Sequence, residues 1–351
     1  MISESEHSCC VLDKEVFRPI FVVGASRSGT TMLNRILGRH DSILAMNELH
    51  FFQSVKEAEP SGTLLAREAA IRVCARLLST IRKGIWKRPD ARDDSDARNL
   101  LSATTTKETW SKSEIFQLVL QAEAEAAGAV YVTDHTPRNI FYAHQLLNTY
   151  PQARVIHMVR DPRAVLYSQK NRWRLRALAS RQRPLWDSFQ AMANYHPFTL
   201  SVLWKKATKL GLELGDHPRY KMISYEKLVN NPEKHIRDLC TFLNVRFEAQ
   251  MLNVPQMGSS HRFSQTDKLG IHSESLYLWR QGLAQGDILV CESLTGTLMK
   301  QLGYSRERRH ISYIQFARPF ARFPLHLMGV LMTNPTKAFL QFNTLLTRKE
   351  D

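Results

Sequence analysis

The stretch PIFVVGASRSGTT, residues 19–31, decides the fold of this chain. It opens with an apolar, β-branched run over residues 20–23, which predicts a buried strand of a parallel sheet. The chain then turns at Gly24 into a short loop of Ser, Gly and Thr, and residues 32–40 carry apolar side chains at helical spacing. A strand, a glycine loop and a helix N-terminus form an anion cradle, because the first N–H groups of the helix are unpaired and its dipole adds positive charge.

The spacing of this loop almost matches the Walker A pattern GxxxxGK[ST]. Gly24 and Gly29 are correctly spaced, but Thr30 stands where the phosphate-gripping lysine belongs, and the cation of the loop is Arg27. A kinase or NTPase also needs a Ser or Thr that holds Mg²⁺ for β/γ-phosphate chemistry. An arginine inside the loop suits a terminal phosphate bound without a metal, so we expect no metal ligands. An ordinary strand–turn–helix with a degenerate P-loop is the alternative.

The RSGTT sequence of this loop resembles the 5′-phosphosulfate loop of sulfotransferases that use 3′-phosphoadenosine 5′-phosphosulfate (PAPS). The resemblance is closest to the tyrosylprotein-type and bacterial branches of that family. It implies that Arg27, Ser28, Gly29, Thr30 and Thr31 bind the 5′-phosphosulfate. Arg27 would also stabilise negative charge on the leaving phosphate.

A second motif, RDPRAVLYS at residues 160–168, follows a predicted buried strand. In sulfotransferases a strand-ending Arg and a Ser eight residues later hold the 3′-phosphate, and Arg160 and Ser168 have this spacing. A guanidinium can fork onto a phosphate, and a hydroxyl in the following helix can donate to the same oxygens. Alternatively, Asp161 caps a helix that has Pro162 at its first position, and the two interpretations are compatible.

A third motif, SYEKLV at residues 224–229 followed by Pro232, resembles the YEDLV…P segment of sulfotransferases. This segment supports the sheet beside the nucleotide, so its role is mostly structural. The resemblance makes Tyr225 a candidate for cofactor contact.

A fourth motif, WRQGL at residues 279–283, resembles a segment that closes over the 3′-phosphate with an Arg and backbone N–H groups. Arg280, Gln281 and Gly282 are therefore candidate cofactor ligands. Gln281 replaces the usual lysine, so one cation is lost. The start of an amphipathic helix with a surface arginine is the alternative. Ser264 and Lys268, in the preceding loop, are further candidates to face the site.

The catalytic base is expected shortly after the phosphate loop, where residues 43–46 predict a second strand that ends in polar residues. The tyrosylprotein-type enzymes keep a catalytic Glu at this place, which makes Glu48 the candidate. Cytosolic small-molecule sulfotransferases use a His, so His50 is the second candidate. A surface carboxylate, or a partner for Arg27, is the other interpretation of Glu48.

His135 stands where the resembling KTP or KDP segment has a lysine that contacts the transferring group. A protonated His could take that role, but its charge fades near neutral pH. The neighbouring Asp134 could keep it charged. A neutral structural His is the alternative.

Strands alternating with helices predict an α/β fold with a P-loop-type parallel sheet flanked by helices. Further strands are expected over residues 129–133, 154–159 and 220–224. Residues 62–128 are predicted to be a helical insertion that caps the acceptor side, with a charged surface loop over residues 82–98. The expected organisation is a disordered lead-in over residues 1–17, a sulfotransferase domain over 18–305 with a mobile lid over 173–186, and a C-terminal tail over 306–351.

The composition points to an anionic partner. The chain of 351 residues has 48 Lys and Arg against 33 Asp and Glu, a net charge of +15. This balance suits a nucleotide cofactor, an acidic substrate, nucleic acid or an anionic membrane. No zinc-finger spacing, RNP-type motif or basic helix with heptads is visible, so we expect no nucleic-acid partner.

The five cysteines form no CxxC pair and no disulfide framework. The acidic, polar start of the chain is not a secretory signal, and no run of 18 apolar residues is present. These features predict a cytoplasmic location.

The tail over residues 306–351 is basic and aromatic. It is either a helix packed on the core or an interfacial helix that makes a peripheral contact with an anionic membrane or a partner.

The four motifs together predict an enzyme that transfers a sulfuryl group from PAPS to a hydroxyl or amine acceptor, roughly in line. The acceptor class stays open, with a weak preference for a bulky or lipid-like molecule. Two alternatives remain: a P-loop kinase that uses Mg-ATP, and a non-catalytic nucleotide-binding module.

Overall fold

The computed structural model describes most of the chain, in two compact units. The described residues are 17–52, 64–84, 87–103, 107–172, 184–254, 270–271, 273, 276–307 and 313–333. The first unit comprises Met1–Val23, Leu33–Ile156 and His217–Lys221, and the second comprises Gly24–Met32, His157–Asp216 and Met222–Asp351. The described residues leave out all of the predicted lead-in (1–17) except Phe17, and most of the predicted lid (residues 173–183). They also leave out Ser264 and Lys268.

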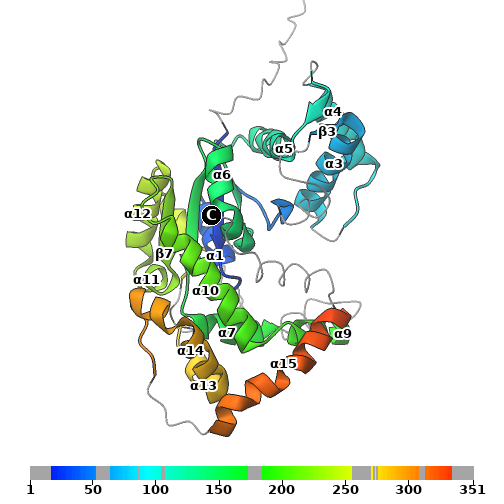
Figure 1. Cartoon of the computed structure of the whole chain (residues 1–351). Helices are drawn as coiled ribbons and strands as arrows, with labels where there is room; N and C mark the ends of the chain where they lie inside the picture. The colour runs from blue at the N-terminus through cyan, green and yellow to red at the C-terminus, as the bar shows by residue number, and fades with distance from the viewer. Residues whose placement is uncertain are drawn as a thin grey trace, which may run out of the picture. The chain divides into compact units, whose positions relative to one another are not determined.

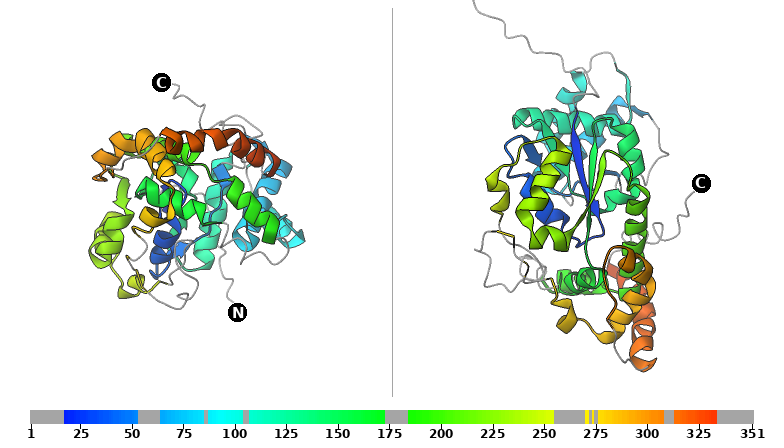
Figure 2. Two further views of the ribbon diagram at one scale, coloured as in Figure 1. Left: turned by 90° about the horizontal axis from the view of Figure 1, so that it is seen from below. Right: turned by 90° about the vertical axis from the view of Figure 1, so that its left-hand side faces the viewer.

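A five-stranded sheet in the order β2-β5-β1-β6-β7 forms the centre of the fold. The strands β1 and β2 pair with β5 in parallel, and Figure 2 shows helices on both faces of the strands. The predicted parallel α/β fold is therefore confirmed. The strand bounds are Pro19–Gly24 (β1), Ile43–Ala45 (β2), Tyr131–Asp134 (β5), Arg154–Val159 (β6) and Tyr220–Ser224 (β7).

The central strand β1 is buried along its whole length, as its apolar sequence predicts. It leads into α1 (Thr30–Leu37), whose Leu33, Ile36 and Leu37 are fully buried. Burying each such side chain contributes roughly 1.5–3 kcal/mol, so this strand–loop–helix segment is firmly held at both ends.

The predicted helical insertion is present in the first unit, with one correction. Helices α3 (Arg67–Lys83) and α5 (Lys112–Ala126) pack on each other, and a short antiparallel pair, β3 (Leu65–Ala66) with β4 (Thr109–Trp110), lies beside them. The prediction of a charged loop over residues 82–98 is wrong over its second half, because α4 spans Ala91–Ser102. Asp90 and Asp93 form a capping box that starts this helix, and Lys83 and Arg82 neutralise the buried Asp93 carboxylate.

The second unit is largely helical and is built around α7 (Pro162–Lys170), which is buried on several sides. Ala164 and Leu166 pack with Trp279, whereas Val165 packs with Trp204. Helix α10 (Pro197–Glu213) lies along α14 (Gln285–Gln301), which in turn contacts α15 (Tyr313–Thr333), as Figure 1 shows. The remaining elements are η1 (Pro137–Tyr142), α6 (Ala143–Thr149), α9 (Pro184–Ala193), α11 (Tyr225–Asn230), α12 (Pro232–Leu243), η2 (Ala249–Leu252) and α13 (Trp279–Gly282).

None of the helices in the described ranges is both long enough and apolar enough to cross a lipid bilayer. The three cysteines in those ranges, Cys74, Cys240 and Cys291, are free and buried. Burial raises the pKa of Cys74 and Cys291 to about 12 and that of Cys240 to about 11, so these thiols stay protonated.

Candidate functional site

The loop between β1 and α1 has the tight geometry of an anion cradle. Gly24, Arg27 and Gly29 all have positive φ, at 149°, 75° and 101°, and the N–H of Ser28 donates to the carbonyl of Ala25 over 3.1 Å. A Cβ on Gly29 would lie 2.5 Å from the ring of Tyr225. Glycine is therefore required at this position for both conformation and space.

Tyr225, from the third motif, lies against the loop and also against Arg160. The guanidinium carbon of Arg160 is 4.3 Å from the centroid of the Tyr225 ring, within the range of a cation–π contact. The Arg160 Nη1 also donates to the carbonyl of Arg27 over 3.4 Å. The structure thus brings the first three motifs together in the second unit.

Arg27 and Ser168 make the direct side-chain contact between the first two motifs. The Nε of Arg27 donates to the Ser168 hydroxyl over 3.1 Å. Ser168 is buried on α7, two turns after Arg160, as the spacing predicts. The phosphate-loop cation and the predicted 3′-phosphate ligands therefore belong to one cluster.

Two polar atoms of this cluster are buried without a hydrogen-bond partner in the described residues. They are the hydroxyl oxygen of Ser28 and the Nε of Arg160. Leaving a buried polar group unpaired costs about 1–3 kcal/mol, and more for a charged group. These atoms fit an anionic ligand, which would accept hydrogen bonds from both.

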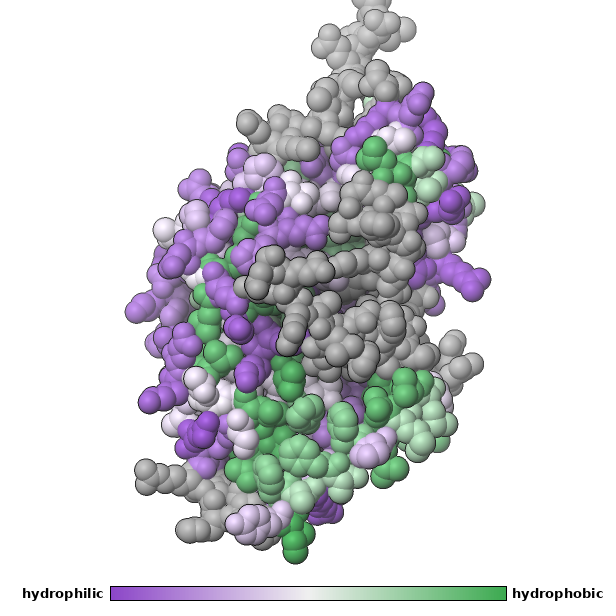
Figure 3. All heavy atoms as spheres, in the orientation of Figure 1, coloured by the Kyte–Doolittle hydropathy of each residue, from purple (hydrophilic) through white to green (hydrophobic). Residues whose placement is uncertain are grey.

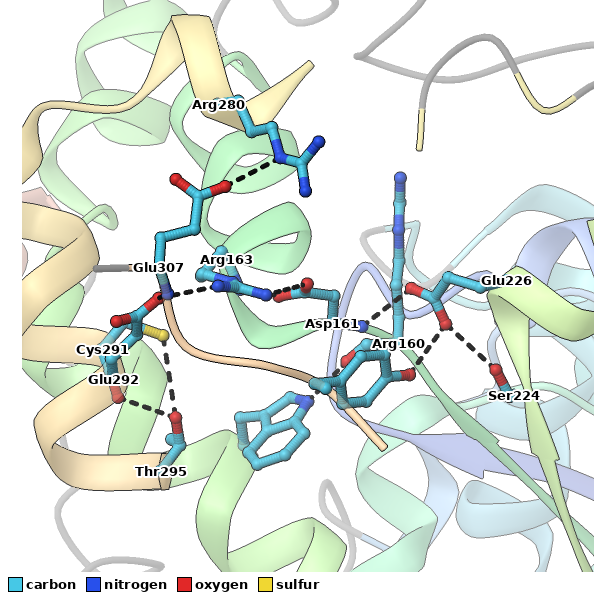
Figure 4. A network of polar contacts seen from close by, with 12 residues as sticks. Arg160, Asp161, Arg163, Ser224, Glu226, Arg280, Cys291, Glu292, Thr295 and Glu307 are labelled. Carbon is cyan, nitrogen blue, oxygen red and sulfur yellow. Dashed lines mark hydrogen bonds and ion pairs between the residues drawn. The ribbon is translucent and has the colours of Figure 1, made fainter. Parts of the chain in front are cut away.

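Arg160 differs from its neighbour Arg163 in its electrostatic partners. Arg163 donates to Asp161 and to Glu292, over 2.7 Å in each case, and lies 4.0 Å from the ring centroid of Trp279. Burial lowers the pKa of Arg163, but the two carboxylates raise it by more, so the net pKa is above its ordinary value and Arg163 stays charged. Within the part of the chain that the structure describes, no carboxylate forms an ion pair with Arg160, and in Figure 4 its side chain points away from Asp161 and Glu292.

The main chain at Arg160 is fixed from both sides. Its carbonyl accepts a hydrogen bond from the indole of Trp204 over 2.9 Å, and the next N–H, of Asp161, donates to Glu226 over 2.9 Å. Glu226 also accepts from the Tyr304 hydroxyl over 2.7 Å (Figure 4 shows the carboxylate). The third motif therefore supports the second structurally, as the sequence indicates.

Asp161 also caps α7, which bears out the alternative interpretation of the second motif. Its carboxylate accepts from the N–H of Arg163 over 2.9 Å, and Pro162 takes the first helical position. The helix cap leaves the Arg160 side chain available for the predicted phosphate contact, because the cap uses the side chain of the next residue, Asp161.

The fourth motif, α13, is anchored to α7. A Cβ on Gly282 would collide with the ring of Tyr167, and Lys170 donates to the carbonyl of Gly282 over 3.1 Å. Arg280 is exposed and pairs with Glu307 over 2.8 Å, and Gln281 is exposed beside it. A phosphate that binds Arg280 has to compete with the carboxylate of Glu307.

The two candidate bases, in the first unit, contact each other. The Nε2 of His50 lies 2.9 Å from the Oε2 of Glu48, with side-chain exposures of 26% for His50 and 40% for Glu48. The N–H groups of Leu49 and His50 both donate to the hydroxyl of Thr136, over 3.0 and 3.1 Å. This fixes the segment, in which His50 has a positive φ of 51°.

His135 lies next to Thr136, buried and oriented by the main chain. Its Nδ1 is 2.8 Å from the carbonyl of Met46, so Nδ1 carries a proton and Nε2 is the atom left for chemistry. The carboxylate of Asp134 accepts instead from Thr136 and from the Asn139 amide over 2.8 Å. Burial raises the pKa of Asp134, against the opposing effect of these hydrogen bonds and of His135.

The sequence did not identify the residues that hold this second cluster together. Thr136 ties the Glu48 segment to the end of β5, and Asn139 ties Asp134 to the 3₁₀ turn η1. The sequence signal for this arrangement is the Thr136-Pro137 pair directly after β5, because Pro137 takes the first position of η1. In the described ranges no three His, Cys, Asp or Glu side chains are grouped as metal ligands.

Comparison with known proteins gives a consistent result. The model of the "Sulfotransferase family" matches residues 19–249 of this chain. An omega-hydroxy-beta-dihydromenaquinone-9 sulfotransferase (Stf3) of Mycobacterium tuberculosis is 26% identical over 69% of this chain and 67% of its own length. A protein-tyrosine sulfotransferase of Drosophila melanogaster is 23% identical over 81% of this chain and 51% of its own length.

The solved sulfotransferase domain from the curacin biosynthetic pathway is 19% identical, with a TM-score of 0.49, over 83% of this chain and 99% of that domain. The chain spans between 30% and 67% of the length of the curated relatives that it matches.

Proposed function

Because the chain belongs to the sulfotransferase family, whose sulfuryl donor is PAPS, we propose that it transfers a sulfuryl group from PAPS to a hydroxyl or amine acceptor. The observation that carries this proposal is the state of Arg160. It is a buried arginine with an unpaired Nε, beside a phosphate-type loop and without a carboxylate partner in the described residues. An arginine in that state is suited to a phosphate.

The proposed donor ligands follow from the cluster in the second unit. Arg27, Ser28, Gly29, Thr30 and Thr31 hold the 5′-phosphosulfate with side-chain and main-chain donors. The residues for the 3′-phosphate and the nucleotide are Arg160, Ser168, Tyr225, Arg280, Gln281 and Gly282. The unpaired Ser28 hydroxyl and Arg160 Nε support this assignment, because a bound anion satisfies both.

PAPS supplies the activated sulfuryl group, and the chain supplies position and charge. By analogy with phosphoryl transfer, the transition state is loose, so fixed donors near the bridging oxygen do most of the work. Arg27 takes the role of stabilising the leaving phosphate.

Glu48 takes the role of the base that removes the acceptor proton, with His50 as the other candidate. Nε2 of His50 lies 2.9 Å from Oε2 of Glu48, so the two candidates stand side by side. His135 takes the role of contacting the transferring group, and Nε2 is the nitrogen available for it, since Nδ1 is held by the carbonyl of Met46.

A bulky, apolar hydroxyl compound is the acceptor class we favour. Directly after His50, the partly buried rings of Phe52 and Tyr142 contact each other, and Phe52 also packs on the buried Phe116 at a ring distance of 5.0 Å. The relative Stf3 is named for a lipid-like alcohol, whereas the Drosophila relative is named for protein tyrosine. Both are hydroxyl acceptors with apolar bodies.

The wider organisation is part of the same proposal. Residues 18–305 make the transferase domain, with residues 62–128 as the acceptor-side cap. The free, buried thiols are compatible with a reducing, cytoplasmic location. The described part of the C-terminal tail, α15, makes a peripheral membrane contact.

The experiment is an acceptor screen with the purified full chain. Release of adenosine 3′,5′-bisphosphate from PAPS is followed with long-chain alcohols, tyrosine peptides and sugars, with Mg-ATP as the alternative donor. Acceptor-dependent release without metal is the expected result. Transfer from Mg-ATP instead would replace the proposal with a kinase.

A further inference from the structure

The helices α9 and α15 expose an unusual number of large apolar side chains. Six of them define a surface that we call the apolar face, with side-chain exposures between 47% and 86%. They are Leu185, Phe189 and Met192 of α9, and Leu325, Leu327 and Leu331 of α15.

The two helices form one continuous surface. The amide of Gln190 donates to the carbonyl of Thr333 over 2.9 Å, and a Cβ on Gly329 would lie 3.5 Å from the Cβ of Ala193. Figure 1 draws α9 beside the end of α15, and Figure 3 shows hydrophobic side chains gathered over this part of the molecule.

Helix α15 is held on the protein along one side only, where Pro319 and Phe323 contact His196. Of its 21 residues, only Pro319, Val330 and Thr333 are buried, and these lie on one side of the helix. At about 100° per residue, the exposed Leu325, Met328 and Met332 fall on the opposite side, and Leu327 and Leu331 lie on the adjoining flank. Single exposed apolar residues are ordinary, but a contiguous set marks a contact with a partner or a membrane.

The positive charge of α15 favours an anionic bilayer over a second copy of the chain as the partner of the apolar face. Helix α15 contains no acidic residue, and its cations, Arg318 and Arg322, are exposed one turn apart at the border of the apolar face. The whole chain has a net charge of +15. Two copies facing each other would add positive charge to positive charge, whereas an anionic bilayer complements it.

We infer that the apolar face docks on the surface of an anionic lipid bilayer. The leucines, Phe189 and Met192 enter the boundary between headgroups and acyl chains, while Arg318 and Arg322 contact lipid phosphates. Since no described helix qualifies as a membrane span, α15 lies in the plane of the interface. This inference deepens the membrane contact proposed above and does not depend on transferase activity.

The test is flotation of the purified full chain with vesicles of phosphatidylcholine alone, or of phosphatidylcholine and phosphatidylglycerol in equal parts. We expect binding to the anionic vesicles that weakens as salt is raised. Leu325→Asp and Leu331→Asp should each weaken it roughly tenfold or more, because an aspartate opposes burial of the helix. Arg318→Gln and Arg322→Gln should each weaken it roughly fivefold.

The matched control is Leu64→Asp, which changes a leucine of 59% exposure in the first unit and should leave vesicle binding unchanged. Binding of adenosine 3′,5′-bisphosphate by each variant, measured separately, shows that the fold is intact and reports on the proposed function independently. Equal binding by Leu325→Asp and the unchanged chain would overturn the inference. So would a dimer that the same substitutions dissociate without any binding to vesicles.

Discussion

Glu48 is the first candidate for the catalytic base and His50 the second. Single substitutions of the two residues distinguish between them. Glu48→Gln removes the carboxylate charge while keeping the shape, so turnover should fall by about 10²–10⁴-fold and cofactor affinity should stay unchanged. His50→Gln should reduce turnover less, because it leaves the carboxylate of Glu48, the proposed base, in place. Initial rates across pH, with Kd for adenosine 3′,5′-bisphosphate, separate the two effects.

Glu68→Gln is the control, since Glu68 is an exposed glutamate paired with Arg98 in the first unit. If His50→Gln abolishes turnover while Glu48→Gln keeps it, the histidine is the base.

Gly29 is required because Tyr225 occupies the space where a Cβ would stand. Gly29→Ala should push the loop away from the Tyr225 ring and weaken binding of adenosine 3′,5′-bisphosphate by about tenfold or more, or about 1.4 kcal/mol. Gly128→Ala is the matched control, because Gly128 also has a positive φ, of 66°, but has no atom within 4 Å of the added Cβ. Titration calorimetry gives both Kd values.

An alanine at position 29 that binds as tightly as glycine would show that the loop does not depend on this close packing.

Strand β6 carries a buried histidine that should make the protein sensitive to acid. Burial lowers the pKa of His157 to about 3, from an ordinary value of 6.5. Between pH 6.5 and 3 the unfolded chain therefore binds a proton at His157 that the folded protein does not bind. The free energy of unfolding is highest above pH 6.5 and falls as the pH drops towards 3. At about 1.4 kcal/mol per pH unit, roughly 2 kcal/mol of the free energy of unfolding is lost at pH 5.

Urea unfolding at pH 7 and pH 5 measures this loss. His157→Gln should reduce the difference between the two pH values, whereas His144→Gln, on the exposed side of α6, should not. A pH difference that His157→Gln leaves unchanged would assign the acid sensitivity to other groups.

Local patterns were enough to predict the elements that carry the site. Short apolar runs predict the strands β1, β6 and β7. Pro232 marks the break between α11 and α12. Each of these signals involves only a few neighbouring residues. The charged segment that became α4 was missed, because its stability comes from the Asp90 cap and from Lys83 on another helix. Charge alone does not separate a solvated loop from a capped surface helix.

The sequence predicted the candidate ligands but not the residues that support them. The loop, Arg160, Ser168 and Tyr225 each belong to a short motif, and the structure brings them into contact; their role as ligands stays a prediction. The Arg163–Glu292 ion pair joins residues 129 positions apart, and Thr136 holds a segment 86–87 positions away. Such contacts depend on how the chain folds back, and no local spacing records them.

At the scale of the whole molecule, the net charge of +15 serves two kinds of anion in this account. We propose that a few buried or loop-held arginines bind the nucleotide and that the exposed arginines of α15 bind the lipid surface. The two interactions should respond differently to salt, because screening weakens exposed charges much more than buried ones.

We propose above that Arg160 holds a phosphate of the sulfuryl donor. The most direct test is calorimetric titration of the full chain with adenosine 3′,5′-bisphosphate, with and without Mg²⁺, against ATP. We predict tight, metal-independent binding that Arg160→Ala weakens roughly a hundredfold, because the phosphate loses a charge-assisted donor.

Arg237→Ala is the control, since Arg237 also stacks on an aromatic ring, at 3.9 Å from Phe247, but stands on the exposed side of α12. Binding that both variants keep, or a preference for Mg-ATP over adenosine 3′,5′-bisphosphate, would contradict the claim.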